Sequence, residues 1–538
     1  MILSLCVLLF ISANALDIGY ELMFTTNMDA IPRTCSKLPS HFPMESFEDS
    51  SYLIQSVGAF DFEGYEFQMI LDGFGKLYRF QFLKETNEIC VTASMLKSQW
   101  YNESLKEKRV AQSLIFEETI PPRPKCPLYD PFCNALAPND NDYVLPLKIG
   151  DDFFLTTDNP IYLKYDPDTL SVQKWKFSKG DIEKGFMNMI SMGAAHTVPR
   201  VNDTNAYIGV AIAEPDMMIG RGTLYLYEIT GNDTKTRRVL NTIKLPKNYF
   251  PYDFVFTHYP IQHHTITHKH DRYVHAFGLT EHYAVLSLQP ASMRLGMKSL
   301  MSGTLSNTIE NYDESEMANS LTVVPLDGSA PTVFPMRSPQ WSVHVVNTYE
   351  NDTSVIFDYC SFPDMPFRDP LQLLSTRLNK TARDASQCRA QVKRAVLQLS
   401  GPRKGDSEIL TLTELPRMVE FPMINFSDRG RSYCTFYGVE YWHDDGKTQS
   451  CIALRRTNIC QDNVTYWYRE NVYPSEPTFV QSKEKNQNGG YLVFVALHGE
   501  EKISKFHVID AETFEDISET SLPTWIPFTA HGGFFSDV

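Results

Sequence analysis

The chain of 538 residues is 43% hydrophobic and 12% aromatic, and its formal net charge is −16. This composition supplies ample apolar material for a large core, and a chain of this length normally holds two or more domains. The acidic balance excludes electrostatic attraction to nucleic acid as the basis of function.

The first fifteen residues, MILSLCVLLFISANA, have the form of a secretory signal peptide. Ile2–Ile11 is almost continuously apolar, and Ala13-Asn14-Ala15 has the small-x-small form that signal peptidase accepts. This stretch is too short to span a bilayer, and no later segment is long and apolar enough to do so. We therefore predict that residues 1–15 are removed and that the protein enters the secretory pathway, secreted or lumenal.

Glycosylation sequons and cysteines agree with a location in the secretory pathway. Removal of the signal peptide leaves nine of the ten cysteines, and in an oxidising compartment some of them should pair. We favour Cys126 with Cys133, which flank a proline-rich loop, and Cys451 with Cys460 is another candidate. Cys360 ends the apolar run VIFDYC, which predicts a buried free thiol.

N-x-S/T sequons predict a glycoprotein, at Asn102, Asn202, Asn232, Asn351, Asn379, Asn425 and Asn463.

Short alternating runs dominate the rest of the chain, and helical periodicity is nearly absent. In chain order the runs include YLIQSV, KLYRFQF, TLYLYEI, YAVLSL, SVIFDY, QSCIALR, YLVFVAL and KFHVID. Their bounding Gly, Pro, Asn and Asp residues are typical of antiparallel β-structure, whereas Gln387–Leu399 predicts either a short helix or a polar-faced strand. No linker divides the chain, so we expect residues 16–538 to form one all-β domain, and a propeller would avoid long exposed sheet edges.

Seven of the fourteen histidines lie in the stretch FTHYPIQHHTITHKHDRYVHAFGLTEHY. For His258–His270 we favour a polar loop, and the alternative is a surface metal site of the histidine-rich type. His275 is predicted to lie on one face of a strand, between Tyr273 and Phe277, with a turn beginning at Gly278. A lone inward histidine is usually a hydrogen-bonded core residue, so this pattern alone makes His275 only a candidate for chemistry.

The segment YVHAFGLTEHYAVL resembles a signature segment of the carotenoid cleavage oxygenases, Y-x-H-S/A-F-G-x-T-E-x-Y, in which the histidine binds iron. That family includes β-carotene oxygenases and the retinoid isomerohydrolase of the retinal pigment epithelium. Four further segments match in the family's order: GAAHTVPRVNDTNAYIGVA, WSVHVVNTYENDTSVIFDYC, MVEFPMINFSDRGRSYCTFYG and PTWIPFTAHGGFF. Weaker matches extend the resemblance from about Gly19 to the C-terminus. The resemblance nominates as metal ligands His196, His275, His344 and His531.

For the fold, the resemblance implies a seven-bladed β-propeller with iron on its axis. The residues agree, because His196 and His531 are 335 positions apart and no pair of the four ligands has helical or hairpin spacing. Distant strands must therefore meet at a common axis. Four neutral imidazoles suit a divalent late first-row metal, and the resemblance implies Fe(II).

The resemblance also implies carboxylates that accept the outer N–H groups of the ligand histidines, namely Asp158 in TTDNP, Glu420 in VEFP and Glu476 in PSEP. Glu420 lies among apolar residues, where an ionised carboxylate is costly unless it is satisfied. At Asp158 the family usually has Glu, which is one methylene longer. Either the backbone moves inward, or a water bridges, or one histidine is held less firmly. Thr157 matches a family threonine near the substrate cavity, and we interpret Glu281 and Glu350 as structural.

A second departure lies at Ile120–Asp140, where animal members carry a Pro-Asp-Pro-Cys-Lys stretch. This chain has YDPFCNAL, which keeps the Asp, Pro and Cys but has an insertion and no lysine. In the family this neighbourhood lies near the membrane-facing mouth of the tunnel. Pro127–Leu136 therefore predicts either peripheral membrane contact or an ordinary disulfide-braced loop.

The leading hypothesis is a non-haem Fe(II) dioxygenase that uses O2 to cleave a double bond of a carotenoid or apocarotenoid into carbonyl products. Its partners would be an apolar polyene and O2, and the sequence carries no indication of oligomeric state. One alternative keeps the iron but performs retinoid ester isomerohydrolysis. Another is a secreted, weakly catalytic propeller that binds an apolar ligand, and a third places zinc in the His258–His270 loop.

Overall fold

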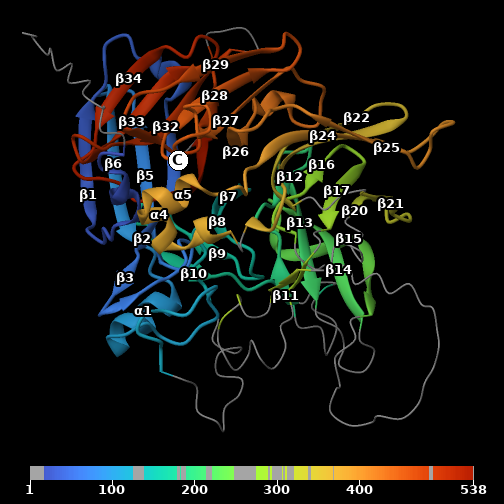
Figure 1. Ribbon diagram of the computed structural model, residues 1–538, viewed down its shortest axis with the longest axis horizontal. Coiled ribbons are helices and arrows are strands. Elements are labelled where there is room, and N and C mark those ends of the chain that lie inside the picture. The colour runs from blue at the N-terminus through green and yellow to red at the C-terminus, as the bar shows by residue number, and fades with distance from the viewer. Residues whose placement is uncertain are drawn as a thin grey trace, which may run out of the picture.

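The chain forms seven successive antiparallel sheets of four or five strands each, within the residues that the structure describes. The colours of Figure 1 run around these sheets in chain order. The arrangement is a seven-bladed β-propeller, as the sequence analysis expected. The computed structural model describes residues 17–124, 139–178, 182, 190–213, 221–247, 274–288, 291–293, 304, 306, 309–311, 320–336, 341–366, 369–483 and 489–536. Outside these ranges lie the signal peptide, the Cys126 and Cys133 pair, Pro127–Leu136 and the His258–His270 loop.

The first four blades are built from strands between Ile31 and Pro335 and from the last strand. Blade 1 comprises, from the outside inwards, β1 (Ile31–Lys37), β6 (Glu88–Met95), β5 (Phe74–Leu83), β2 (Ser50–Ala59) and β35 (Thr529–Ser536). Blade 2 comprises, from the inside outwards, β7 (Leu145–Ile149), β8 (Asp152–Thr156), β9 (Leu163–Tyr165) and β10 (Val172–Lys174). Blade 3 comprises β11 (Ile190–Gly193), β13 (Ala206–Ala213), β14 (Arg221–Thr230) and β15 (Asp233–Lys247), with β12 (Val198–Pro199) paired to β13. Blade 4 comprises β16 (Gly278–Leu279), β17 (Tyr283–Leu288), β20 (Ser320–Pro325) and β21 (Thr332–Pro335).

The remaining blades follow the same order, with the first strand of each sheet innermost. Blade 5 comprises β22 (Trp341–Glu350), β23 (Ser354–Phe362), β24 (Gln391–Gln398) and β25 (Ser407–Thr411). Blade 6 comprises β26 (Met418–Met423), β27 (Thr435–Tyr441), β28 (Ala453–Asn458) and β29 (Asn463–Trp467). Blade 7 comprises β30 (Val472–Pro474), β32 (Gly490–His498), β33 (Ile503–Asp510) and β34 (Asp516–Ser521), with β31 (Thr478–Gln481) paired to β32.

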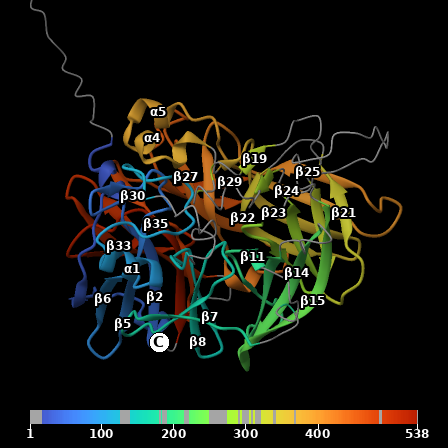
Figure 2. The ribbon, with the colours of Figure 1, turned by 90° about the horizontal axis from the view of Figure 1, so that it is seen from below.

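A few short elements lie outside the blades. Helices α4 and α5 lie together on one face of the molecule, at the top of Figure 2. Two small hairpins pair β3 (Asp61–Phe62) with β4 (Tyr65–Glu66) and β18 (Ala291–Met293) with β19 (Ile309–Asn311). The helices are α1 (Gln99–Glu107), α4 (Leu374–Leu378) and α5 (Lys380–Asp384), with short 3-10 turns at Tyr20–Phe24, Met44–Ser46, Pro370–Gln372 and Phe426–Asp428.

The two ends of the chain close the ring. Strand β35, from the C-terminal end, pairs antiparallel with β2 in the register Tyr52 to Phe534 and Leu53 to Gly533. The red strands consequently return beside the blue ones in Figure 1. Closure in this way makes β35 the innermost strand of blade 1, and it also contacts β7, the innermost strand of blade 2.

Apolar side chains pack between neighbouring blades, which explains why the inner strands read as continuous hydrophobic runs. All nine residues of β32 are buried, because both of its faces meet another blade, whereas β34 at the outer edge is mostly polar and partly exposed. Between blades 1 and 7, the rings of Phe80 and Phe506 stack with their centroids 4.8 Å apart, and both are buried. The burial of these alternating and apolar runs is what holds the blades together.

The structure decides between two alternatives and corrects two local predictions. Gln387–Leu399 contains the strand β24, so the polar-faced strand and not the short helix is confirmed. Gly278 lies in β16 and does not begin a turn, and His275 precedes this strand. A Cβ atom at Gly278 would collide with the hydroxyl of Thr348, so the glycine permits close packing against β22. The run QSCIALR enters its strand only at Ala453.

The predicted pairing of Cys451 with Cys460 is wrong. Cys460 is joined to Cys434, and Cys451 is a buried free thiol. The reason is strand register: Thr435 pairs with Asn458, so Cys434 and Cys460 flank the same end of the β27–β28 hairpin. A second disulfide joins Cys35 and Cys90 on paired strands, and Cys360 is a buried free thiol, as predicted.

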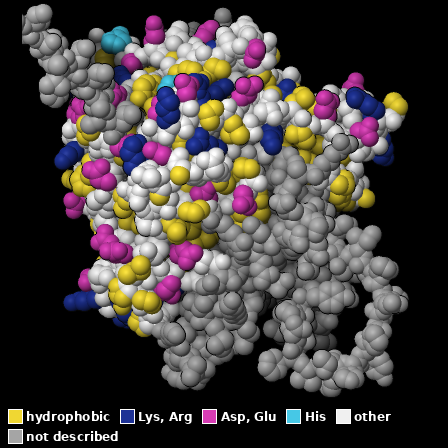
Figure 3. All heavy atoms as spheres, in the orientation of Figure 1, with side chains coloured by type: hydrophobic (Ala, Val, Ile, Leu, Met, Phe, Trp, Pro, Cys, Tyr) yellow, Lys and Arg dark blue, Asp and Glu magenta, His cyan; other side chains and the backbone are white. Residues whose placement is uncertain are grey.

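The surface carries both signs of charge. Figure 3 shows acidic and basic side chains interspersed with apolar ones over the described face of the molecule. Among the described residues, no helix combines the length and apolar character that crossing a membrane would require.

Ring closure predicts the effect of a single substitution. Phe80→Ala removes a fully buried ring between blades 1 and 7, and should destabilise the protein by about 3–5 kcal/mol through lost burial and the cavity left behind. Leu410→Ala is the matched control, because Leu410 is 42% exposed on the outer strand β25. Calorimetric unfolding should show a clearly lower melting temperature for Phe80→Ala and almost no change in melting temperature for Leu410→Ala. Equal melting temperatures would contradict the assignment of this core to ring closure.

Candidate metal centre

Four histidines from four blades meet at the axis of the propeller. His196 follows β11, His275 precedes β16, His344 lies on β22 and His531 lies on β35. One ring nitrogen from each lies within 4.8 Å of the corresponding nitrogens of the others. Each histidine is thus on the innermost strand of its blade or immediately beside it, which is why residues so far apart in sequence can meet.

Carboxylates orient three of these imidazoles. His275 Nδ1 lies 2.9 and 3.0 Å from the two carboxylate oxygens of Asp158, which directly follows blade 2 strand β8. His344 Nδ1 lies 2.5 Å from Glu420 Oε2, and His531 Nδ1 lies 2.9 Å from Glu476 Oε1. Because an ionised carboxylate only accepts hydrogen bonds, each Nδ1 carries the proton, and each Nε2 keeps its lone pair.

These lone pairs supply the test of whether a cation fits the site. The Nε2 atoms of His344 and His531 are 3.1 Å apart, and both Nδ1 atoms already hold the proton. The two rings are inclined at 85° with centroids 4.8 Å apart, so the nitrogens converge on a point beside both rings. His196 Nε2 is buried and has no hydrogen-bond partner among the described residues. Converging lone pairs in a dry interior repel unless a cation lies between them, so the donor set fits a metal ion.

His196 is held in a different way from the other three. Its backbone N–H donates to the carbonyl of His275 over 3.2 Å, and the Thr156 hydroxyl donates to the carbonyl of Ala195 over 2.8 Å. The hydroxyl of the next residue, Thr197, shares a 2.5 Å hydrogen bond with Tyr162. Burial, reinforced by the neighbouring imidazoles, lowers the pKa of His196 well below 6.5 and keeps the ring neutral, as a ligand must be.

Phe421 is a site residue that the sequence analysis missed. Its backbone has φ +51°, a conformation rare for a bulky residue, and its N–H donates to Glu420 Oε2 over 2.8 Å. The ring centroid lies 5.3 Å from that of His344 and 5.6 Å from that of His531. The left-handed turn thus fixes the carboxylate and packs an apolar ring against two ligands. Its only sequence signal was its place in the segment MVEFPMI.

The structure also places Asp158, Thr157 and Glu350, which the sequence analysis named. Asp158 contacts His275 directly, so of the three alternatives for this shorter acid the bridging water does not apply. Thr157, beside it, is half-buried. Glu350 receives a hydrogen bond from the His282 ring over 2.8 Å and another from the Thr280 hydroxyl over 3.2 Å, away from the four axial histidines.

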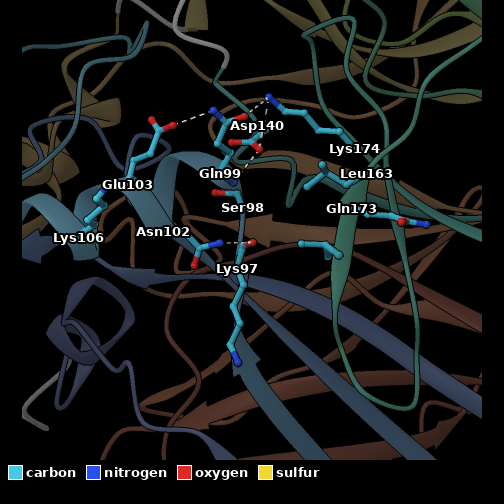
Figure 4. A pocket seen from close by; sticks show the side chains of 11 residues that line it. Lys97, Ser98, Gln99, Asn102, Glu103, Lys106, Asp140, Leu163, Gln173 and Lys174 are labelled. Carbon is cyan, nitrogen blue, oxygen red and sulfur yellow. Dashed lines mark hydrogen bonds and ion pairs between the residues drawn. The ribbon is translucent and has the colours of Figure 1, made fainter.

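One cavity adjoins the site and a larger one does not. The larger, about 500 Å³, is an open groove between α1 and β10, lined by Lys97, Gln99, Asn102 and Glu103 among others (Figure 4), and none of the axial histidines lines it. The smaller, about 30 Å³, lies against Phe421 and Glu476 and is walled by Tyr441, Tyr473 and Val495, among others. It is large enough for one water-sized molecule.

The fold and the site define a class of protein: a seven-bladed propeller with a metal centre of four histidines on its axis. A family model described as retinal pigment epithelial membrane protein (RPE65) matches residues 49–536, and the chain belongs to this family. The resemblance that the sequence segments indicated is therefore confirmed.

Relatives and solved structures agree with this membership. The chain is 23% identical over 563 residues to the mitochondrial carotenoid-cleaving dioxygenase of Macaca fascicularis, covering 95% of this chain and 93% of the relative. It is 21% identical over 501 residues to the β,β-carotene 15,15′-dioxygenase of Gallus gallus, covering 86% and 88%. The fold is similar to that of a cobalt-substituted Synechocystis apocarotenoid oxygenase, with a TM-score of 0.75, 15% identity and coverage of 96% and 98%.

A second histidine pair, in blade 7, shows how a non-metal arrangement differs. The Nε2 atoms of His498 and His507 are 3.0 Å apart, but the ring planes are parallel and the centroids are 5.3 Å apart. The rings therefore meet head-on, which is the geometry of one N–H donating to the other nitrogen. Lys505 and Arg469 already engage the adjacent Glu519, so a cation is not favoured there.

This pair predicts a pH dependence of stability. Burial, and then the neighbouring His507 and Lys505, lower the pKa of His498 to about 4, against 6.5 in an unfolded chain. The unfolded state therefore binds the extra proton first, and stability that is complete above pH 6.5 should fall by roughly 1–2 kcal/mol as the pH drops towards 4. Denaturant unfolding at a series of pH values checks this.

His498→Gln should flatten this part of the profile. The carboxylates of Asp516 and Glu519, whose pKa values are lowered to about 2, should produce a separate loss below pH 4 in both proteins. An unchanged slope between pH 6.5 and 4 in the variant would refute the assignment to His498.

Proposed function

We propose that this protein is a non-haem Fe(II) dioxygenase that cleaves a double bond of a carotenoid or apocarotenoid to carbonyl products. The observation that carries the proposal is the convergence of His196, His275, His344 and His531 within 4.8 Å on the propeller axis. Membership of the family and relatives named as carotenoid-cleaving enzymes support the substrate class.

Iron is the metal that the chemistry favours. Four neutral imidazoles leave the full charge of a divalent ion in place and suit late first-row metals in general. A relative described as cobalt-substituted shows only that such a fold accepts another divalent ion. Zinc has no redox chemistry, whereas cleavage of a double bond by O2 is a redox reaction, so Fe(II) is the proposed cofactor.

The residues of this chain position the reaction and do not exchange protons with the substrate. Bound Fe(II) would supply the redox-active centre at which O2 and an electron-rich double bond react. Asp158, Glu420 and Glu476 hold the protons of His275, His344 and His531 on Nδ1, which keeps each Nε2 available and each ring fixed. The Phe421 ring packs against the rings of His344 and His531 and helps to fix them.

Loss of one ligand tests the metal centre. The purified protein should contain about one iron ion per chain, and His275→Ala should lose most of it. His282→Ala is the matched control, because His282 is exposed and bonded to Glu350 outside the centre. Metal analysis by atomic emission measures both. Retention of iron in the first variant would refute the assignment of the ligands.

The reaction is tested by oxygen uptake and product analysis against a panel of carotenoids and apocarotenoids. Incorporation of isotopically labelled O2 into carbonyl products supports cleavage. Conversion of a retinoid ester without incorporation would instead favour the isomerohydrolase alternative. Polyene binding without iron would favour the carrier alternative.

The proposal includes a secretory address, with residues 1–15 as a signal peptide and residues 16–538 as one propeller domain. Two observations support the address. Disulfides join Cys35 to Cys90 and Cys434 to Cys460, and such bonds persist in oxidising compartments. Six of the seven sequon asparagines are exposed, and only Asn425 is buried. Peripheral membrane contact through Pro127–Leu136 stays a prediction.

Glycan mapping tests this address. In secreted protein, peptide N-glycosidase should release glycans from several exposed sequons, whereas Asn425 should stay unmodified because it is buried and its side-chain oxygen accepts the Ser427 N–H. Mass spectrometry after deglycosylation identifies the sites. A secreted protein modified at Asn425 but not at the exposed sequons would contradict this.

A further inference from the structure

Four successive polar residues, Asn139, Asp140, Asn141 and Asp142, each bind a different part of the fold. Asn139 donates to the carbonyl of Leu114 over 2.6 Å. Asn141 donates to the carbonyl of Gly73 over 2.7 Å and accepts the N–H of Gly75 over 2.9 Å. The segment immediately precedes β7, the innermost strand of blade 2, so it is anchored firmly next to the propeller axis.

Asp140 ties the same segment to helix α1. Its carboxylate accepts the N–H groups of Gln99 and Trp100 over 2.7 and 3.0 Å and lies 3.7 Å from Lys174 Nζ (Figure 4). The side chain is 2% exposed. Because these bonds reach blade 1, α1 and β10, the segment cannot shift without breaking several buried hydrogen bonds.

Asp142 connects the segment to the turn that follows β8. Asn159 Nδ2 donates to Asp142 Oδ1 over 2.6 Å and to the carbonyl of Asn139 over 2.7 Å, and Asn159 Oδ1 accepts the N–H of Ile161 over 2.7 Å. Asn159 directly follows Asp158, the acid that orients His275. We call the hydrogen-bonded pair Asp142 and Asn159 the clamp. Because Asn159 is next to Asp158, the clamp bears on how far the Asp158 backbone reaches towards the axis.

The same segment also touches a second ligand histidine. The N–H of His531 donates to the carbonyl of Val144 over 3.1 Å, two residues after Asp142. On the other side, the N–H of Gly193 donates to the carbonyl of Asp158 over 2.9 Å. The turn that carries Asp158 is thus held between the polar segment and blade 3.

We propose that Asp142 and Asn159 are positioning residues of the metal centre, which draw the turn inward so that an aspartate, one methylene shorter than glutamate, reaches His275. The proposal rests on the metal centre assigned above. It identifies what compensates for the short acid: the hydrogen bond between Asn159 and the buried Asp142, and not a bridging water.

The chemistry of Asp142 supports an acceptor role. The residue is fully buried, and its Oδ2 has no hydrogen-bond partner in the described part of the chain. Burial raises the pKa of Asp142 well above its usual value. In either protonation state its Oδ1 can accept the hydrogen bond that Asn159 donates. An amide has the same shape and the same acceptor, so Asp142→Asn should preserve the clamp.

Metal affinity of the full-length protein tests the proposal, measured by Co(II) titration with the visible absorption of the bound ion as readout. Asn159→Ala should weaken Co(II) binding roughly 10–100-fold and alter the absorption bands, as loss of an orienting group does. Asn241→Ala is the matched control. The Asn241 side chain, like that of Asn159, donates two hydrogen bonds and accepts one N–H, but it lies on the outer strand β15. This control should lose comparable stability while keeping its Co(II) affinity.

Rescue separates positioning from general stability. Asp158→Glu in the Asn159→Ala background should restore Co(II) affinity, because the longer acid reaches His275 from a backbone that has moved outward. Asp142→Ala should resemble Asn159→Ala, and combining the two should add little, whereas Asp142→Asn should bind Co(II) as the unaltered protein does.

The outcomes keep this proposal distinct from the proposed function. Unchanged Co(II) affinity and absorption in Asn159→Ala, or no rescue by Asp158→Glu, would overturn the positioning role alone. Failure of the unaltered protein to bind any divalent metal would overturn the metal centre itself. Because Co(II) binding needs neither polyene nor O2, inactivity towards carotenoids has no effect on this test.

Discussion

The convergence of four imidazole lone pairs on one point is the constraint on which the rest of the structure depends. His196, His275, His344 and His531 come from blades 3, 4, 5 and 1, so they meet only if the ring of blades is closed. Pairing of β35 with β2 provides that closure, and the apolar cores between blades hold it. A disturbance of a distant blade interface therefore reaches the axis, because the ligands share no local element that could hold them together.

Orientation, and not distance, separates a metal centre from a proton-sharing pair in this protein. The nitrogens of His344 and His531 are 3.1 Å apart, and those of His498 and His507 are 3.0 Å apart. At the axis, carboxylates hold the protons on the outer nitrogens and the rings are inclined at 85°. In blade 7 the rings are parallel and meet head-on. Three carboxylates thus decide where the protons reside, and a cation becomes the natural occupant of the axial point.

Sequence patterns anticipated the strands well and their partners poorly. YAVLSL coincides with β17 and YLVFVAL lies within β32, because alternation and apolar runs are local properties of a strand. The pairing of Cys434 with Cys460 depends on the register between β27 and β28, which no single strand carries. The sequence predicts a turn at Gly278, but in the structure this glycine allows close approach to Thr348, a contact between blades.

The fold class, the strand runs and, through resemblance to a family, the four histidines and three carboxylates of the site could be predicted from the amino-acid sequence. How those groups are held depends on contacts that form only in the folded chain. The left-handed backbone of Phe421, the anchoring of Thr197 to Tyr162 and the Asp142–Asn159 clamp all join residues that are remote in sequence or depend on backbone angles. The amino-acid type shows which side chains are able to bind a metal or accept a proton. Whether it points at the axis is set by strand register and by burial against neighbouring blades, which arise only when the ring has closed.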